Sequence, residues 1–258
     1  MDPSLRDAWE RHAHDWAAWA RRPGFDSYWR FGRDAFHALV PPPGRLTLDV
    51  GCGEGRVARD LAARGHRVRG VDGSATLVAL AREASPELDF AVADAAALPF
   101  ADGEADLVVA YMSLQDVDDL GGAVREAARV LEPGGRLCAA IVHPLNSAGA
   151  FASDDVGSPF VVEDSYLATR RYQDEIESEG LKMTFASEHR PLEAYSRALE
   201  AAGFAIEAIR EPAVPPGSWD ARREARWARI PMFLYLRAVR SSGGVAVGRS
   251  AATPNMPS

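Results

Sequence analysis

Glycines and acids recur at close spacing in residues 46–74, which read LTLDVGCGEGRVARDLAARGHRVRGVDGS. An apolar segment runs into Gly51, Gly53 and Gly55, a helical pattern follows, and a second apolar segment ends at Asp72. Glycines at a strand-to-helix turn let a ligand approach the backbone, because no Cβ stands in the way. The helix N-terminus favours a negative group, and an acid about twenty residues later can bind ribose hydroxyls. This pattern indicates a site for a ribose-containing ligand.

The spacing argues against a nicotinamide dinucleotide. The dinucleotide fingerprint G-x-G-x-x-G needs a third glycine where this chain has Arg56. The third glycine is instead Gly55, and an acid, Asp49, stands two residues before the first glycine. A carboxylate there sits badly beside a pyrophosphate, but it suits a ligand that carries an ammonium and a sulfonium.

The elements that must position these residues follow from alternating apolar and helical patterns. Strands alternating with helices predict a parallel sheet covered on both faces. Two later strands, 205–211 and 231–239, should pair antiparallel at one edge of that sheet. The other predicted strands are 46–50, 67–71, 88–93, 106–112 and 136–142, and the predicted helices are 56–64, 120–131, 191–202 and a short one near 220–229.

Residues 46–143 resemble the class I S-adenosylmethionine-dependent methyltransferases. The resemblance rests on LDVGCGEG (48–55), GVDGS (70–74), VADAAALPFADGEADLVVA (92–110) and LEPGGRL (131–137). It implies a doubly wound, Rossmann-like α/β fold, with a seven-stranded sheet that ends in an antiparallel strand. It also implies S-adenosylmethionine as the cofactor and S-adenosylhomocysteine as the product.

The resemblance assigns cofactor contacts to matching residues of this chain. The methionine end would lie against Asp49 and the glycine turn. Asp72 would bind the ribose hydroxyls, and Asp94, with the backbone at Ala95, would bind the adenine amino group. The reactive methyl would lie beside the backbone after the fourth strand. Some of these assignments have a structural alternative. Asp49 and Gly53 could serve only to form the turn, Asp94 could be a helix N-cap, and Cys52 could be a small buried side chain. The full set is Asp49, Gly51, Cys52, Gly53, Gly55, Asp72, Gly73, Ser74, Asp94, Ala95, Tyr111 and Met112.

Three residues near the strand ends are candidates for catalysis. His143 follows the fifth strand and could take a proton from an acceptor, since histidine titrates near neutral pH; the alternative is a histidine bonded to nearby backbone. Gln115 and Asp116 follow the fourth strand, and Asp116 could orient an acceptor ammonium or phenol or could cap the next helix.

Two further segments are expected around the acceptor. Residues 1–40 should form a helical cap, with Trp9, Trp16 and Trp19 packing on the sheet. In the family that the chain resembles, an N-terminal segment often closes over cofactor and substrate, so Tyr28 and Trp29, in a less regular stretch of that cap, are candidate cofactor-binding pocket residues. Residues 144–188 form an insertion at the rim where ligands bind in such sheets, and within it 165–187 reads as a hairpin lid around Glu179-Gly180.

The composition and the cysteine spacing argue against nucleic acid and metal ions as binding partners. The net charge of −8 disfavours nucleic-acid binding, and AYMSLQ after the fourth strand differs from the Asn-Pro-Pro-Tyr type of base N-methyltransferases. Neither Cys52 nor Cys138 has zinc-site spacing, so no metal is expected. We expect a single methyltransferase domain over 1–240, a disordered tail over 241–258, no membrane association, a cytoplasmic location, and a monomer or homodimer.

The function expected from the sequence is methyl transfer from S-adenosylmethionine to O or N of a small-molecule acceptor. The alternatives are an RNA or protein methyltransferase, and a methyltransferase-like protein that binds the cofactor but catalyses another reaction or none.

Overall fold

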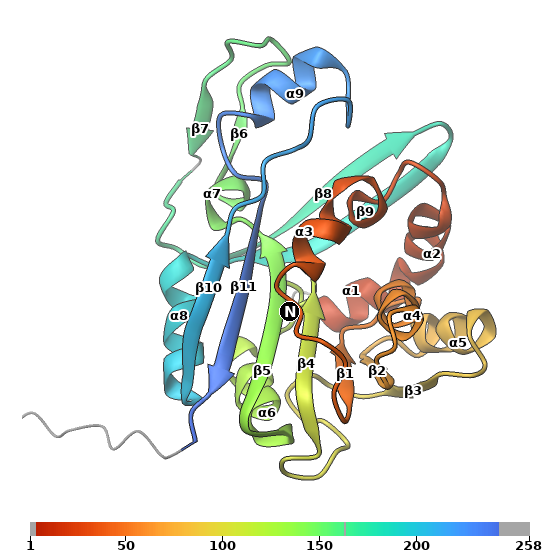
Figure 1. Cartoon of the computed structure of the whole chain (residues 1–258). Coiled ribbons are helices and arrows are strands. Elements are labelled where there is room, and N and C mark those ends of the chain that lie inside the picture. The colour runs from red at the N-terminus through yellow and green to blue at the C-terminus, as the bar shows by residue number, and fades with distance from the viewer. Residues whose placement is uncertain (1–3, 163, 243–258) are drawn as a thin grey trace, which may run out of the picture.

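A computed structural model describes residues 4–162 and 164–242, and the remainder of the expected tail lies outside the described residues. Its centre is a seven-stranded sheet with the order β10-β11-β5-β4-β1-β2-β3 (Figure 1). The strands are β1 (Thr47–Val50), β2 (Val68–Asp72), β3 (Asp89–Val92), β4 (Ala105–Tyr111), β5 (Leu131–Val142), β10 (Phe204–Arg210) and β11 (Phe233–Arg240).

The pairing of these strands confirms the predicted fold class. Strands β1 to β5 pair in parallel, whereas β11 runs antiparallel to both β5 and β10. The predicted edge hairpin of β10 and β11 is therefore present. The fifth strand begins at Leu131, earlier than expected, so the Glu132–Gly135 turn lies inside β5 rather than before it.

Alternating side chains of the strands fill two cores, one on each face of the sheet. On β4, Val108 and Ala110 face the core under α6 (Leu120–Val130) and α8 (Leu192–Ala201). Leu107, Val109 and Tyr111 face the opposite core. This alternation is the period of two expected for a strand that is buried on both faces. The second core is closed by α3 (Arg33–His37), α4 (Arg56–Ala63) and α5 (Ala75–Ala84).

The helices begin where their capping residues predict. Gly55, with a φ of 86°, precedes α4, and the Ser74 side chain accepts the N–H of Leu77 at the start of α5. Asp119, not Asp116, caps α6. The capping alternative therefore belongs to Asp119, and Asp116 is left for another role.

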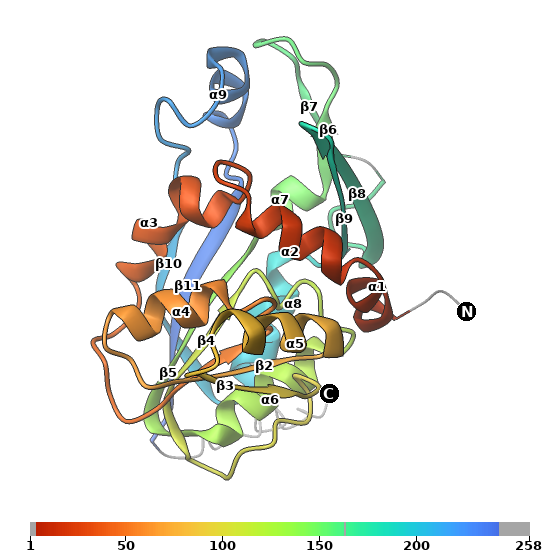
Figure 2. The same ribbon diagram turned by 90° about the vertical axis from the view of Figure 1, so that its right-hand side faces the viewer.

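Two groups of elements cover the carboxyl ends of the parallel strands, as the two views show (Figures 1 and 2). The first is the N-terminal cap and the predicted lid hairpin, which lie side by side. The second is a smaller group around α9. The cap consists of α1 (Leu5–Arg11), α2 (Ala13–Arg21) and the π-helix η1 (Tyr28–Gly32). The hairpin consists of β8 (Arg170–Ser178) and β9 (Leu181–His189). The smaller group consists of α7 (Pro144–Ser147), β6 (Gly149–Phe151), β7 (Phe160–Val162) and α9 (Ala221–Trp227).

No helix within the described ranges is both long enough and apolar enough to cross a membrane. The same ranges hold no group of three or more His, Cys, Asp or Glu side chains placed to bind a metal ion.

Candidate functional site

A cavity of about 710 Å³, here named the main cavity, lies between the carboxyl ends of the strands and the elements that cover them. Its volume is within the range of small-molecule sites, about 300–1,000 Å³. Twelve of the predicted site residues line it: Gly51, Cys52, Gly53, Asp72, Gly73, Ser74, Asp94, Ala95, Tyr111, Met112, Gln115 and Asp116.

The glycine turn offers bare backbone to the main cavity. Gly51 and Gly53 have φ values of 75° and 55°, a left-handed conformation that favours glycine. A Cβ built on Gly51 would lie 2.3 Å from the Cβ of Ser113, so no other residue fits there. The backbone N–H groups of Gly51 and Cys52 donate to the carbonyl of Val71, which ties the turn to β2.

Asp49 lies beneath this turn and does not line the main cavity. Its side chain is buried, and its Oδ2 has no hydrogen-bond partner among the described residues. Burial raises the pKa of Asp49 to about 7, against the opposing influence of the nearby Arg56 charge. The unpartnered Oδ2 of this buried carboxylate suits the ammonium of a methionine moiety. Gly55 also lies outside the cavity lining and serves as the N-cap of α4.

Two further acids stand where a nucleoside would need acceptors. The Asp72 carboxylate accepts the N–H groups of Gly53 and Ser74, each at 2.8 Å. Each carboxylate oxygen has a second lone pair, so Asp72 can also accept ribose hydroxyls. Asp94 is exposed to the cavity, and its Oδ1 accepts the N–H of Ala96 at 2.8 Å. The donor and acceptor set therefore fits S-adenosylmethionine.

Cys52 is a small buried side chain in this wall. Burial raises the pKa of its thiol well above the usual value, and a protonated thiol is a poor nucleophile.

Asp116 is a half-buried acid in the wall of the main cavity. Its Oδ1 accepts the hydroxyl of Ser187 at 2.7 Å, and its Oδ2 accepts Nε2 of Gln115 at 3.3 Å. Burial raises the pKa of Asp116 well above its usual value, and the negative charge of Asp72 raises it further. Asp72 and Asp116 both line the main cavity.

Gln115 is held beside Asp116. Its Nε2 also donates to the carbonyl of Met112 at 2.8 Å, while its Oε1 has no partner in the described part of the chain. The amide oxygen is thus an enclosed acceptor that no donor of the described residues satisfies.

His143 lies outside the main cavity, which corrects the expectation that it is a base. Its Nδ1 accepts the N–H of Leu145 at 3.0 Å, and its Nε2 lies 2.8 Å from Oε1 of Glu211. Because Nδ1 is an acceptor, Nε2 carries the proton in the neutral ring and donates it to Glu211. The histidine caps α7, as its structural alternative proposed.

Tyr28 and Trp29 are also placed away from the main cavity, so they are not pocket residues. Tyr28 is fully buried, and its hydroxyl donates to Asp60 Oδ2 at 2.6 Å. Trp29 is 47% exposed and lies under the guanidinium of Arg33. The π-helix directs these two rings away, and their neighbours Ser27, Arg30 and Phe31 line the cavity.

The three N-terminal tryptophans line the main cavity instead of packing on the sheet. Trp9, Trp16 and Trp19 surround Phe185 of β9 in edge-to-face contacts, with ring centroids 6.5, 5.9 and 6.2 Å away. Trp9 Nε1 also donates to the carbonyl of Ala186 at 2.9 Å. Helical spacing predicts a buried face but not the surface that covers it, so the sequence did not reveal this contact.

Arg56 is a further cavity residue that sequence reasoning passed over. It is buried, forms an ion pair with Asp26, and lies over the ring of Trp16 at 4.6 Å. The sequence GEGR could have indicated this role, because Arg56 is the first residue of the helix that follows the glycine turn and a side chain there lies beside the cavity.

The hairpin presents one face to the main cavity. Tyr172, Asp174 and Ile176 of β8, and Phe185 and Ser187 of β9, line it. The register pairs Tyr172 with Ser187 and Asp174 with Phe185, so these side chains share a face. The predicted lid thus forms part of the cavity wall.

Comparison with known proteins gives a consistent family. The family described as "Methyltransferase domain" matches residues 48–139. The demethylmenaquinone methyltransferase of Chlorobaculum tepidum is 31% identical over 193 residues, which are 70% of this chain and 75% of that protein. The ubiquinone/menaquinone biosynthesis C-methyltransferase UbiE of Caulobacter vibrioides is 36% identical over 140 residues, 48% of this chain and 56% of that protein.

A solved structure agrees with these relatives. The S-adenosylmethionine-dependent methyltransferase from Mesorhizobium loti superposes with a TM-score of 0.66 and 27% identity, over 80% of this chain and 96% of that one. The chain spans about half the length of the first curated relatives it matches.

Proposed function

The chain belongs to the class I S-adenosylmethionine-dependent methyltransferases, and we propose that its acceptor is a small, largely apolar molecule with an ionisable hydroxyl. The observation that carries this proposal is the half-buried Asp116 carboxyl, which accepts the Ser187 hydroxyl and lines a cavity that aromatic side chains also line. A pKa raised by burial brings this carboxyl closer to the pKa of a phenol, which is about 10, and proton transfer is most efficient between groups of similar pKa.

The cofactor supplies a methyl group on a positively charged sulfur. We propose that the turn backbone and Asp49 hold its methionine end, Asp72 its ribose, and Asp94 with the backbone at Ala95 its adenine. The unpartnered oxygen of Asp49 and the free lone pairs of Asp72 support these assignments. Tyr111 and Met112 would then lie beside the methyl group.

Asp116 would act on the acceptor. Its carboxylate takes the hydroxyl proton, and the Nε2 of Gln115 helps to hold that carboxylate in place. The oxygen left behind, or a ring carbon conjugated with it, then bonds to the methyl group while the carbon–sulfur electron pair returns to sulfur. When the methyl group bonds to a ring carbon, that carbon then loses its proton and the carbonyl oxygen gains one, which restores the aromatic hydroxyl. Both reactions leave S-adenosylhomocysteine.

Alignment of the two reactants contributes much of the rate in such a transfer. The main cavity is closed over the strand ends by the tryptophans of the cap and by the hairpin. These side chains exclude water around the reacting atoms, and their rings offer flat apolar surfaces to an aromatic acceptor.

Carbon methylation of a quinol is a second candidate. The relatives named above include a demethylmenaquinone methyltransferase and a C-methyltransferase of quinone biosynthesis. A quinol has the ionisable hydroxyl and the conjugated ring carbon that this reaction needs. The carbon chemical shift of the transferred methyl, measured by NMR on the product, distinguishes a methyl on carbon from one on oxygen.

The test is a turnover screen with methyl-labelled S-adenosylmethionine. The panel contains phenols, quinols, amines, RNA and a protein extract, and each arm is checked for labelled product and S-adenosylhomocysteine. We expect label in a phenol or quinol. Label in amines, RNA or protein alone would overturn the proposal, and so would tight binding of S-adenosylhomocysteine with no labelled product from any arm.

Replacing Asp116 tests the role of the carboxyl. Asp116→Asn should lower kcat by about 10²–10⁴-fold, the usual contribution of a positioned base, with unchanged cofactor affinity. Because the base must be ionised, wild-type kcat should rise with pH through the raised pKa of Asp116, and this rise should vanish in the variant. Asp34→Asn, at a side chain 91% exposed and outside the cavity lining, is the matched control. An intact pH profile in Asp116→Asn would exclude a base.

A further inference from the structure

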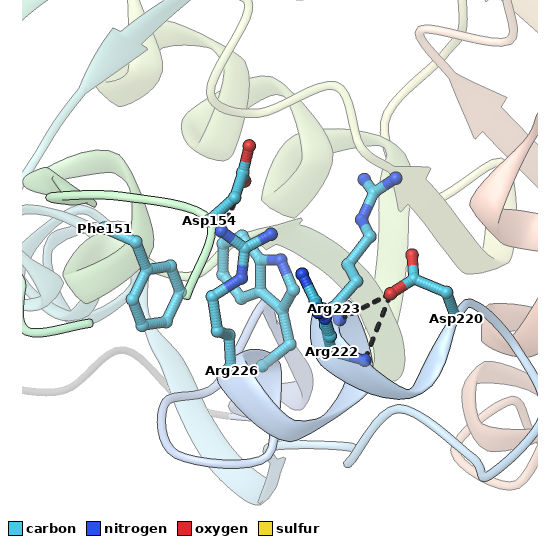
Figure 3. Close-up of a pocket in the computed structure, with 7 residues that line it drawn as sticks. Phe151, Asp154, Asp220, Arg222, Arg223 and Arg226 are labelled. Atoms are coloured by element: carbon cyan, nitrogen blue, oxygen red, sulfur yellow. Dashed lines mark hydrogen bonds and ion pairs between the residues drawn. The ribbon is translucent and has the colours of Figure 1, made fainter. Parts of the chain in front are cut away.

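Arginine side chains gather at the edge of the main cavity, beside α9 (Figure 3). They border a second cavity of about 530 Å³, here named the rim cavity. The rim cavity is lined by Phe151, Asp154, Asp220, Arg222, Arg223, Arg226 and Trp227. Arg223 and Trp227 line the main cavity as well, so the two spaces share a wall.

The two acids of the rim cavity are already engaged. Asp154 forms an ion pair with Arg226, which also donates to the carbonyl of Ser153 at 2.9 Å. Asp220 caps α9, and its Oδ1 accepts the backbone N–H groups of Arg222 and Arg223, drawn as dashed lines in Figure 3. Neither acid forms an ion pair with the Arg223 side chain.

The side chains of Arg222 and Arg223 have no acidic partner among the described residues, and of these two only Arg223 also lines the main cavity. Within residues 4–162 and 164–242, no hydrogen bond or ion pair holds the guanidinium of Arg223, which stacks on the ring of Trp219 at 4.1 Å. Arg30 lies over the same ring at 5.8 Å and donates to the carbonyl of Ser218. Burial and the charges of Arg30 and Arg226 lower the pKa of Arg223. The two positive charges beside the Trp219 ring repel each other, and one bound anion would neutralise this repulsion.

This positive group is part of the main cavity, because Arg30, Trp219 and Arg223 all line it. The planar guanidinium presents paired donors that match a carboxylate or a phosphate. The opposite signs of Asp116 and Arg223 give the cavity a polarity that one acceptor molecule could match.

We infer that the acceptor carries an oxyanion, a carboxylate or a phosphate, which Arg223 and Arg30 bind at the rim while the reacting hydroxyl lies at Asp116. This assignment rests on the proposed function, because it takes the main cavity as the acceptor site. It narrows the substrate class to hydroxylated apolar molecules with an acidic group remote from the methylated atom. Neutral quinols then become poorer acceptors than their acidic counterparts.

Binding of matched probes tests the inference without needing turnover. The probes are 4-hydroxyphenyl alkanoic acids of increasing chain length, their methyl esters and the corresponding phosphate monoesters. They are titrated by calorimetry into the full chain loaded with S-adenosylhomocysteine. We expect one chain length at which the acid or phosphate binds at least about tenfold more tightly than the ester, because charged hydrogen bonds contribute roughly 1.5–3 kcal/mol. The probe class with the larger preference identifies the oxyanion.

Variants assign the preference to the rim. Arg223→Gln should reduce the acid-to-ester affinity ratio by about tenfold, and the double variant with Arg30→Gln should abolish it. Arg197→Gln, an exposed arginine of α8, removes the same charge elsewhere and should preserve the ratio. Equal affinity of acid and ester at every chain length in the wild type would overturn the inference, as would a preference that survives in the double variant.

Two readouts separate this inference from the proposed function. Acetate or inorganic phosphate that binds as tightly as the acid probe would indicate a site for free anions and overturn the acceptor subsite. Methylation of the esters together with equal acid and ester affinity would retain the proposed function and remove the inference. An acid preference that depends on Arg223, without methylation of any hydroxyl compound, would retain an anion site and remove the proposed function.

Discussion

The Asp72 carboxylate binds the N–H of Gly53 at 2.8 Å and so fastens the end of β2 to the glycine turn after β1. Its other oxygen binds the N–H of Ser74 at the start of α5. One side chain therefore shapes the backbone that would contact the methionine end and also faces the place expected for the ribose. Its loss should affect cofactor binding through both roles.

Asp72→Asn separates charge from shape. Asparagine keeps one oxygen acceptor but lacks the negative charge, so we expect S-adenosylhomocysteine to bind about 10- to 100-fold more weakly, since hydrogen bonds to charged groups contribute roughly 1.5–3 kcal/mol. Titration calorimetry measures the affinity, and the melting temperature reports whether the turn is intact. Asp89→Asn, at the exposed start of β3, is the matched control. Equal affinities in the wild type and Asp72→Asn would show that Asp72 does not bind the cofactor.

Asp49 should release a proton when the cofactor binds. Its pKa of about 7 arises mainly from burial, and a bound ammonium favours the ionised form and lowers that pKa. At a pH near 7, binding of S-adenosylhomocysteine should release up to about half a proton, and affinity should rise as the pH increases to about 7 and level off above it. Calorimetry in buffers of different ionisation enthalpy measures the release. If Asp49→Asn releases the same amount, the proton comes from another group.

Phe185 joins the hairpin to the three tryptophans of the cap. Phe185→Ala should raise KM for the acceptor found in the turnover screen, because the cavity wall loses an apolar surface. Replacing a fully buried phenylalanine with alanine typically lowers the free energy of unfolding by about 3–5 kcal/mol. The loss should be smaller here, since this ring is only partly buried. Leu167→Ala, at a side chain 74% exposed, is the control. An unchanged KM would mean that the acceptor does not reach the hairpin.

His143 should affect stability and leave catalysis unchanged. Burial lowers its pKa, so the folded protein binds a proton at this ring less readily than the unfolded chain does. The stability that this group contributes is present above about pH 6.5, the unfolded value, and is lost as the pH falls through the lower folded pKa. His143→Gln should therefore lose less stability than the wild type on acidification, with unchanged kcat per folded molecule. A large fall in kcat would restore His143 as a catalytic candidate.

The sheet and the cofactor side of the site were predictable because their signals are local. The turn at Gly51 and Gly53, the acid at the end of β2 and the alternation along β4 each lie within one short segment whose geometry constrains its residue types. The hairpin around Glu179-Gly180 was also visible, because both residues have positive φ at a two-residue turn.

The acceptor side was predictable only in part: Gln115, Asp116 and the hairpin were expected there, but the contacts between distant segments were not. Trp9 and Ala186 are separated by 177 positions, and Arg30 and Ser218 by 188. Helical spacing indicated that the tryptophans are buried but not that a hairpin covers them. His143 stands at a strand end as a catalytic base often does, yet the chain turns into α7 there and both ring nitrogens are engaged.

The most direct measurement is a crystal structure with bound S-adenosylhomocysteine. The account predicts that its ribose hydroxyls contact Asp72, its ammonium points toward Asp49, and its sulfur faces the part of the main cavity that Asp116 and Gln115 line. The acceptor space should then extend from the sulfur toward Arg223. A ligand whose sulfur faces away from Asp116, or whose ribose lies away from Asp72, would contradict the account.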